Sequence, residues 1–133
     1  MRTLIVEDDI ASRKILLKLL SAYGKCQIAQ NGRQAVDACR KAWADSRPYD
    51  LICMDIMMPE LNGQEALRQI RRIEKELGIA SPQEAKVIMI TALDDSKEVV
   101  EALYEGDASA YFVKPIQIDA FIQELKVLGL IQK

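Results

Sequence analysis

The chain has 133 residues, of which 50% are hydrophobic and 29% charged, a composition that fits one compact domain and excludes a two-domain enzyme. Its 18 basic and 20 acidic side chains give a net charge of −2, which favours neither nucleic acid nor an anionic membrane as a partner. The chain contains no histidine, so imidazole cannot serve as its base or metal ligand. We therefore expect residues 1–133 to form a single domain with no output domain.

The three cysteines, Cys26, Cys39 and Cys53, are odd in number and lie in apolar stretches. This pattern is typical of reduced, buried thiols rather than of disulfides or a zinc site. No apolar run reaches the length of a signal peptide or of a membrane span. The sequence therefore predicts a cytoplasmic protein that does not associate with a membrane.

Five short apolar runs alternate along the chain with segments of helical period. The predicted strands are, in chain order, Leu4–Val6, Gln27–Ala29, Leu51–Met54, Val87–Ile90 and Ala110–Val113. This alternation is typical of a parallel sheet with helices on both faces. Five units are too few for an eight-stranded barrel, so we predict an α/β fold with an open, doubly wound sheet.

The predicted helices share apolar residues spaced three and four positions apart. In chain order they carry Leu16, Leu19, Leu20 and Tyr23; Val36, Cys39 and Trp43; Ala66, Ile70, Ile73 and Leu77; the segment Ser96–Glu105; and Ile118, Phe121, Ile122, Leu125 and Leu128. Gly24, Gly78 and Gly106 follow the first, third and fourth segments, where glycine commonly ends a helix.

Polar side chains follow the predicted strands at the points where the strands end. They are Glu7, Asp8 and Asp9 after the first strand, Asp55 after the third, Thr91 after the fourth and Lys114 after the fifth. Ligands of open α/β sheets bind beyond the carboxyl ends of the strands. We therefore expect carboxylates, one hydroxyl group and one ammonium group to share this edge of the sheet.

Clustered carboxylates are costly unless a cation lies between them, and an all-oxygen set without histidine suits Mg²⁺. We predict Asp8 and Asp55 as direct ligands. Two roles remain open for Glu7 and Asp9: one can act through a bound water molecule while the other only caps the first helix. Lys114 supplies a point charge for a phosphoryl oxygen. The set indicates phosphoryl transfer with a carboxylate nucleophile.

Four segments together resemble the receiver domains of two-component response regulators, the CheY-like group. They are Leu4–Asp9 followed by Arg13, Cys53–Pro59 followed by Asn62 and Gly63, Met89–Ala92, and Tyr111–Pro115. They occur in the family's order across nearly the whole chain. The resemblance implies a flavodoxin-like sheet with strand order 2-1-3-4-5.

The resemblance also implies that Asp55 accepts a phosphoryl group from a phosphohistidine on a sensor histidine kinase or phosphotransfer protein. It places Mg²⁺, with Mn²⁺ as an alternative, on Asp8, Asp55 and the backbone carbonyl of Met57. Glu7 would belong to the acidic pocket, acting directly or through water. The absence of histidine in this chain agrees with a phosphodonor on another protein.

By the same resemblance, Thr91 and Lys114 bind phosphoryl oxygens, and Thr91 and Tyr111 act as switch residues. The face made by the fourth helix, fifth strand and fifth helix would then regulate a downstream protein target. The chain would be a monomer or a phosphorylation-dependent dimer. Met57 and Leu93 are apolar and do not orient an attacking water molecule, which predicts slow autodephosphorylation.

Two other functions compete with this interpretation. A Mg²⁺-dependent phosphatase with an aspartyl nucleophile typically carries a second aspartate two positions on, where this chain has Met57, and no cap insertion is present. A scaffold that binds partners without phosphorylation is the other alternative. We therefore expect that the chain is not an enzyme and that it catalyses only its own phosphorylation and dephosphorylation.

Other segments are less directly tied to this chemistry. The stretches Leu77–Lys86 and Arg40–Tyr49 are longer than the family pattern, and we expect the first to lie at the edge opposite the acidic residues. Either stretch could shape the choice of partner. Arg68, Arg71 and Arg72 are interpreted as the solvated face of the third helix. The tail at Leu130–Ile131 either packs on the domain or contacts a partner.

Overall fold

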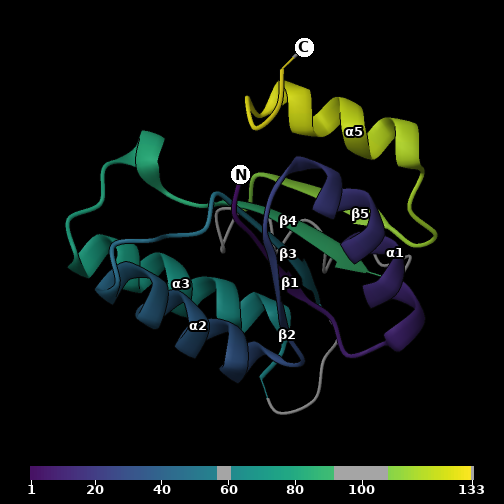
Figure 1. The fold of residues 1–133 in the computed structure, drawn as a ribbon. Helices are drawn as coiled ribbons and strands as arrows, with labels where there is room; N and C mark the ends of the chain where they lie inside the picture. The colour runs from purple at the N-terminus through teal and green to yellow at the C-terminus, as the bar shows by residue number, and fades with distance from the viewer. Residues whose placement is uncertain (57–60, 92–107, 133) are drawn as a thin grey trace.

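The computed structural model describes residues 1–56, 61–91 and 108–132. Its five strands form one parallel sheet of order β2-β1-β3-β4-β5 (Figure 1). The strands are β1 (Thr3–Val6), β2 (Cys26–Ala29), β3 (Leu51–Asp55), β4 (Lys86–Thr91) and β5 (Ala110–Val113). The predicted architecture is confirmed, and each predicted strand lies inside the observed one, which extends by no more than one residue at either end.

Helices α2 (Gly32–Ala44) and α3 (Gly63–Glu76) cover one face of the sheet, and α1 (Ile10–Leu20) and α5 (Ile118–Val127) cover the other (Figure 1). The first helix ends earlier than predicted, because Ser21–Tyr23 tightens into a 3₁₀ turn. A second 3₁₀ turn spans Ser81–Gln83. The helix predicted at 96–105 lies outside the described residues.

The two faces of the sheet carry separate hydrophobic cores. Leu4 and Val6 point into the core under α2 and α3, whereas Ile5 between them points into the core under α1 and α5. All residues of β1 and β3 are buried, as expected of central strands covered on both faces. Leu130 and Ile131 pack against the core under α1 and α5, so the tail packs on the domain.

Three helices begin at a side-chain cap directly after a strand or loop. Asp9, Asn31 and Asn62 each accept a hydrogen bond of 2.9 Å from the backbone N–H three residues further on. Such caps satisfy one of the open N–H groups of the first helical turn. Asp9 therefore has the capping role among the two roles that the sequence left open.

Three helices also end alike. After α2, α3 and α5 the chain turns through a left-handed residue, namely Ser46 (φ 58°), Gly78 (φ 72°) and Gly129 (φ 76°). The N–H of the next residue then bonds to a carbonyl five positions back, with lengths of 2.8, 2.9 and 3.0 Å. Glycine adopts this conformation freely, whereas Ser46 does so at a cost of about 1 kcal/mol.

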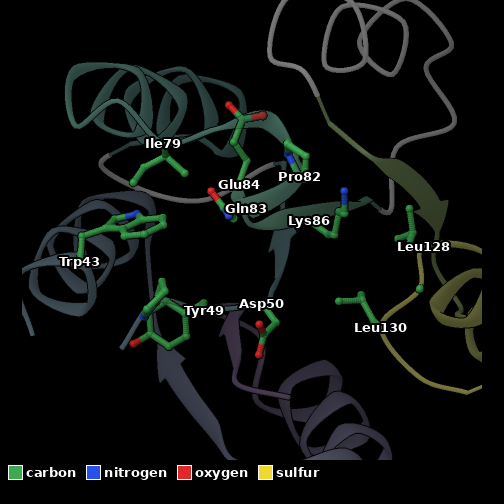
Figure 2. Close-up of a pocket in the computed structure, with 12 residues that line it drawn as sticks. Trp43, Tyr49, Asp50, Ile79, Pro82, Gln83, Glu84, Lys86, Leu128 and Leu130 are labelled. Carbon is green, nitrogen blue, oxygen red and sulfur yellow. The ribbon is translucent and has the colours of Figure 1, made fainter. Parts of the chain in front are cut away.

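The two extended segments lie at the amino edge of the sheet, where the strands begin. The segment after α3 leads into Lys86, the first residue of β4, while the other end of β4, at Thr91, lies at the edge where β3 ends with Asp55. Trp43 and Tyr49 from one segment and Ile79 from the other surround a common pocket of about 510 Å³ (Figure 2). The predicted position of the segment after α3, opposite the acidic residues, is confirmed.

One charged residue of α3 was interpreted wrongly. Arg71 is only 13% exposed, and its Nη1 donates to Glu74 Oε1 at 2.6 Å and to the Ala85 carbonyl at 2.8 Å. Glu74 is fully buried and also accepts from the Ala85 N–H at 2.8 Å. Helical periodicity does not reveal this arrangement, because Ala85, which contacts both Arg71 and Glu74, comes from a loop that folds back on the helix. Arg72 is exposed, as predicted.

The cysteines are free, as predicted, but they are not equally buried. Cys39 and Cys53 are buried, whereas Cys26 on the edge strand β2 is half-buried. Burial raises the pKa of Cys39 to about 12 and also raises the pKa of Cys53. Both thiols are therefore protonated and unreactive near neutral pH.

Within the described ranges, no helix has the length and apolar character needed to cross a membrane.

Candidate functional site

An acidic cluster lies at the carboxyl edge of the sheet, where β1 and β3 end side by side. Val6 pairs with Met54, so the next residues along the two strands, Glu7 and Asp55, are neighbours. Asp8 follows directly. Carboxylate oxygens of Glu7, Asp8 and Asp55 all lie within 4.8 Å of one another. The sheet register thus gathers three acids that stand up to 48 positions apart in the sequence.

Lys114 joins this cluster from the end of β5. Its Nζ lies 2.9 Å from Glu7 Oε2 and 3.3 Å from Asp55 Oδ2. Because β4 lies between β3 and β5, the lysine reaches across the end of a whole strand to make these contacts. One ammonium group therefore serves two buried carboxylates.

Burial makes the charges of this site strongly interdependent. Glu7 is 0% and Asp55 6% exposed, whereas Asp8 faces solvent. Burial raises the pKa of Glu7 to about 7, and the nearby charge of Asp55 adds to this, while the contact with Lys114 opposes it. Burial also lowers the pKa of Lys114, but Glu7 and Asp55 outweigh this effect and raise it. The lysine stays charged, and Glu7 titrates near neutral pH.

The donor set fits Mg²⁺. Among the described residues, the cluster offers three carboxylates as oxygen donors, and the Lys114 ammonium group contacts two of them, Glu7 and Asp55. Hard oxygen ligands and an excess of negative charge are the features that Mg²⁺ selects, and an exposed Asp8 leaves room for the water ligands this ion retains. Asp8 and Asp55 would hold the ion, with Glu7 beside them. The carbonyl of Met57, which the resemblance adds to this set, lies outside the described residues.

Arg13 and Asp9 hold the acidic turn in place. Arg13 Nε donates to the Glu7 carbonyl at 3.2 Å, and its Nη2 donates to the Asp8 carbonyl at 3.4 Å. The Asp9 N–H donates to Glu7 Oε1 at 3.1 Å. The sequence pointed to Arg13 only as part of a motif, and its contacts explain why an arginine stands one helical turn after the acids.

Gly63, the first residue of α3, lets that helix start directly behind Asp55. A Cβ atom at Gly63 would lie 2.2 Å from the Asp55 carbonyl oxygen, which is far below any normal contact. The Gly63 N–H donates to the Ile56 carbonyl at 2.8 Å. The close approach of the helix to the end of β3 therefore requires glycine at this position.

The remaining predicted site residues have different fates. Thr91 ends β4 and pairs with Val113, which brings its backbone to the acidic edge, but its side chain lies outside what the structure describes. Tyr111 lies on the edge strand β5 with its side chain 44% exposed. Met57 and Leu93 lie outside the described residues.

Sequence reasoning missed an apolar hollow beside the acidic cluster. Ser12, Ile15, Lys114, Pro115 and Ile116 line a pocket of about 320 Å³. Ile15 is 54% exposed, and it falls outside the apolar stripe that predicted the first helix. An apolar residue on the polar side of an amphipathic helix was the signal that could have revealed this surface.

Comparison with known proteins adds to this geometry. The family model of the response regulator receiver domain matches residues 3–126. The response regulator MprA of Mycolicibacterium vanbaalenii is 35% identical over 128 residues, which cover 96% of this chain but only 49% of MprA. The chain thus spans about half of that relative. The chemotaxis protein CheY of Thermotoga maritima is 32% identical, with 93% of both chains covered.

A solved structure resembles the fold closely. It is the complex of the Saccharomyces cerevisiae histidine phosphotransfer signaling protein Ypd1 with the receiver domain of its downstream response regulator Ssk1. The match has a TM-score of 0.82 and 30% sequence identity, and it covers 99% of this chain and 90% of the other.

Proposed function

Because this chain belongs to the response regulator receiver domain family, we propose that it is a signalling switch in which Asp55 accepts a phosphoryl group from a partner's phosphohistidine. One observation carries the proposal. The Asp55 carboxylate stands at the end of β3 among two further acids, within 3.3 Å of the Lys114 ammonium group. A nucleophile, a cation site and a fixed positive charge are sufficient parts for phosphoryl transfer.

In the proposed reaction an oxygen of Asp55 forms a bond to phosphorus while the phosphorus–nitrogen bond of the phosphohistidine breaks. The electron pair of that bond returns to the partner's imidazole, and Asp55 becomes an acyl phosphate. Lys114 lies within reach of a phosphoryl oxygen attached to Asp55, and Thr91 is proposed as a second partner of the phosphoryl group. Mg²⁺ held by Asp8, Asp55 and the Met57 carbonyl would offset the negative charges that meet there. Mn²⁺ is proposed as a substitute.

The donor is proposed to be a histidine kinase or a phosphotransfer protein that docks beside α1. Ile10 and Ile15 on α1 and Ile118 on α5 are 62%, 54% and 54% exposed. The apolar pocket at Ile15 also includes Lys114, so this surface continues directly into the site. A protein donor must be held by its surface to bring a phosphohistidine to Asp55, and apolar area next to the acceptor supplies that contact.

The output is proposed to pass through the segment at 96–105, β5 and α5 to a downstream protein target. Phosphorylation would favour one of two packings in so far as Thr91 and Lys114 contact the phosphoryl group better in that packing. Tyr111, exposed on β5, would report the change to the target, and dimerisation through the same face would follow phosphorylation. The chain would catalyse only its own phosphorylation and dephosphorylation.

The chain is also proposed to lie in the cytoplasm, because its free cysteines support a reducing location.

The proposal is tested by the intact mass of the protein after incubation with Mg²⁺ and acetyl phosphate. We expect the mass to rise by one base-labile phosphoryl group in the wild type. We expect no gain with EDTA or in Asp55→Asn. The matched control is Asp37→Asn, which changes an exposed acid on α2 and should label like the wild type.

Two outcomes would contradict the proposal. An unlabelled wild type with no consumption of acetyl phosphate would indicate a scaffold that works without phosphorylation. Rapid consumption of acetyl phosphate without an adduct would indicate a phosphatase.

The docking surface is tested by Ile15→Glu. Acetyl phosphate needs no protein contact, so its labelling of Asp55 should be unchanged. Labelling by any phosphohistidine protein that labels the wild type should fall strongly. Equal labelling of the wild type and of Ile15→Glu by such a protein would show that α1 is not part of the docking surface.

A further inference from the structure

A basic pocket lies at the amino edge of the sheet, at the opposite end of the strands from Asp55. It has a volume of about 340 Å³. Four cationic side chains, Arg2, Lys25, Lys41 and Arg47, line it together with a single carboxylate, Asp45. Arg2 and Lys25 directly precede β1 and β2, and Lys41 and Arg47 flank the end of α2. A chain with a net charge of −2 thus collects four cations around one hollow.

These cations outnumber the carboxylates around the pocket, where Asp45 lines the hollow and Asp50 Oδ2 accepts a hydrogen bond from the Arg2 backbone N–H at 2.7 Å. Across residues 1–56, 61–91 and 108–132, the ion pairs within 4.0 Å include none of the four side chains. Like charges around a concave surface repel one another, and the hollow concentrates their field. The pocket is therefore electrostatically suited to a ligand with several negative charges.

The Arg2 side chain and the backbone of Arg47 are held in position before any ligand arrives. The Arg2 guanidinium lies 5.3 Å from the centre of the Tyr49 ring, and its Nε donates to the Arg47 carbonyl at 3.1 Å. The left-handed turn at Ser46 brings the chain back, so that the Arg47 N–H donates to the Ala42 carbonyl at 2.8 Å. This bond also occupies a terminal carbonyl of α2 that would otherwise disfavour an anion. A preorganised site loses less free energy on binding.

The neighbouring pocket shows that this charge pattern is local. The two pockets share Tyr49, but the neighbour carries Asp50 and Glu84 beside Lys86 (Figure 2). Two carboxylates against one ammonium group do not favour an anion. The positive character is thus confined to the pocket at the end of α2.

We propose that this basic pocket binds a small oligophosphate, either inorganic pyrophosphate or the phosphate chain of a nucleoside triphosphate. Arginine and lysine are the side chains that recognise phosphate oxygens. A volume of about 340 Å³ suits a small ligand rather than an extended polymer. The site uses neither Asp55 nor Mg²⁺, so it is separate from the proposed phosphorylation.

The test is isothermal titration of the whole chain with pyrophosphate, ATP and AMP, at low ionic strength and with EDTA present. We expect one molecule of pyrophosphate or ATP per chain and much weaker binding of AMP, which has a single phosphate. Equal affinity for pyrophosphate and ATP would identify the phosphate chain alone as the ligand. Tighter binding of ATP would add a contact with the nucleoside.

Variants connect the binding to the pocket. Lys41→Glu combined with Arg47→Glu should weaken pyrophosphate binding at least about tenfold. The control, Lys14→Glu combined with Lys18→Glu, makes the same charge change on exposed positions of α1 and should bind like the wild type. Asp55→Asn should also bind like the wild type. Should the pocket variant unfold, the single changes Lys25→Gln and Lys41→Gln at exposed positions should each weaken binding several-fold.

Three results would overturn the proposal. One is the absence of saturable binding of pyrophosphate and ATP to the folded wild type. Another is an equal loss in the α1 control, which would mean a response to overall charge. The third is loss of binding in Asp55→Asn, which would place the anion at the acidic cluster.

Discussion

Two fully buried glutamates stand at opposite ends of the sheet, and they differ in how their charge is compensated. Glu74, near the amino edge, accepts hydrogen bonds from the Arg71 guanidinium and the Ala85 N–H, one on each carboxylate oxygen. Glu7, at the carboxyl edge, accepts the Asp9 N–H on one oxygen and contacts Lys114 with the other, but it shares this ammonium group with Asp55. One carboxylate is balanced by the protein, whereas the other belongs to a cluster with an excess of negative charge.

This difference separates a structural role from a functional one. A buried charge that is completely paired holds a loop on a helix, and its loss destabilises the fold. A buried carboxylate in a cluster with an excess of negative charge is costly for the isolated chain but is compensated when a cation binds. Changes at the two ends should therefore affect different measurements.

The largest effect is expected from Arg71→Ala. This change leaves the buried Glu74 carboxylate without its cation and should lower the free energy of unfolding by about 3 kcal/mol, as measured by urea titration. The control, Arg72→Ala, changes an exposed arginine of the same helix and should stay within about 0.5 kcal/mol of the wild type. Equal effects of the two changes would mean that the Glu74 pair does not stabilise the loop.

Lys114→Ala should act mainly on the reaction. Removing the ammonium group that faces Asp55 should slow labelling by acetyl phosphate about 100-fold, because the charge on the phosphoryl oxygens loses a fixed partner. Lys18→Ala, on the exposed side of α1, should label at the wild-type rate. Labelling of Lys114→Ala at the wild-type rate would contradict the role proposed for this lysine.

Glu7 should make stability depend on pH in the metal-free protein. Its pKa of about 7 in the folded chain lies above the ordinary value of 4.5, so between these values the folded state holds a proton that the unfolded state has released. The contribution of Glu7 to the free energy of unfolding therefore falls as the pH rises from about 4.5 to about 7.

Urea titrations with EDTA at several pH values check this prediction. The stability of the wild type relative to Glu7→Gln should decline over this interval, since glutamine does not titrate. Parallel profiles would mean that Glu7 ionises normally.

The smallest effect is expected at the end of α2. Ser46→Gly relieves a left-handed conformation and should raise the free energy of unfolding by about 0.5 to 1 kcal/mol. Gly78→Ala makes the opposite change in the same motif after α3 and should lower it by about 1 kcal/mol. Neither change should affect labelling of Asp55. A loss of stability in Ser46→Gly would show that the serine side chain contributes something that glycine lacks.

The sequence alone determined most of the fold and the membership of the acidic cluster. Strands buried on both faces must be continuously apolar, so Leu51–Met54 and Val87–Ile90 could be recognised without any partner. Residues directly after parallel strands must meet at one edge, which is why Glu7, Asp8, Asp55 and Lys114 could be predicted as neighbours. Both arguments depend only on local pattern and on a general rule of topology.

Tertiary structure decided the features whose partners come from unrelated positions in the chain. Asp9 and Glu7 look equivalent in sequence, yet the first is an exposed helix cap and the second is buried against Lys114. Arg71 was predicted to be solvated, and the loop that folds back gives it the Ala85 carbonyl and binds Glu74, its partner three positions along the same helix. Burial and charge pairing are sums over all neighbours in space, and no periodicity along the chain contains them.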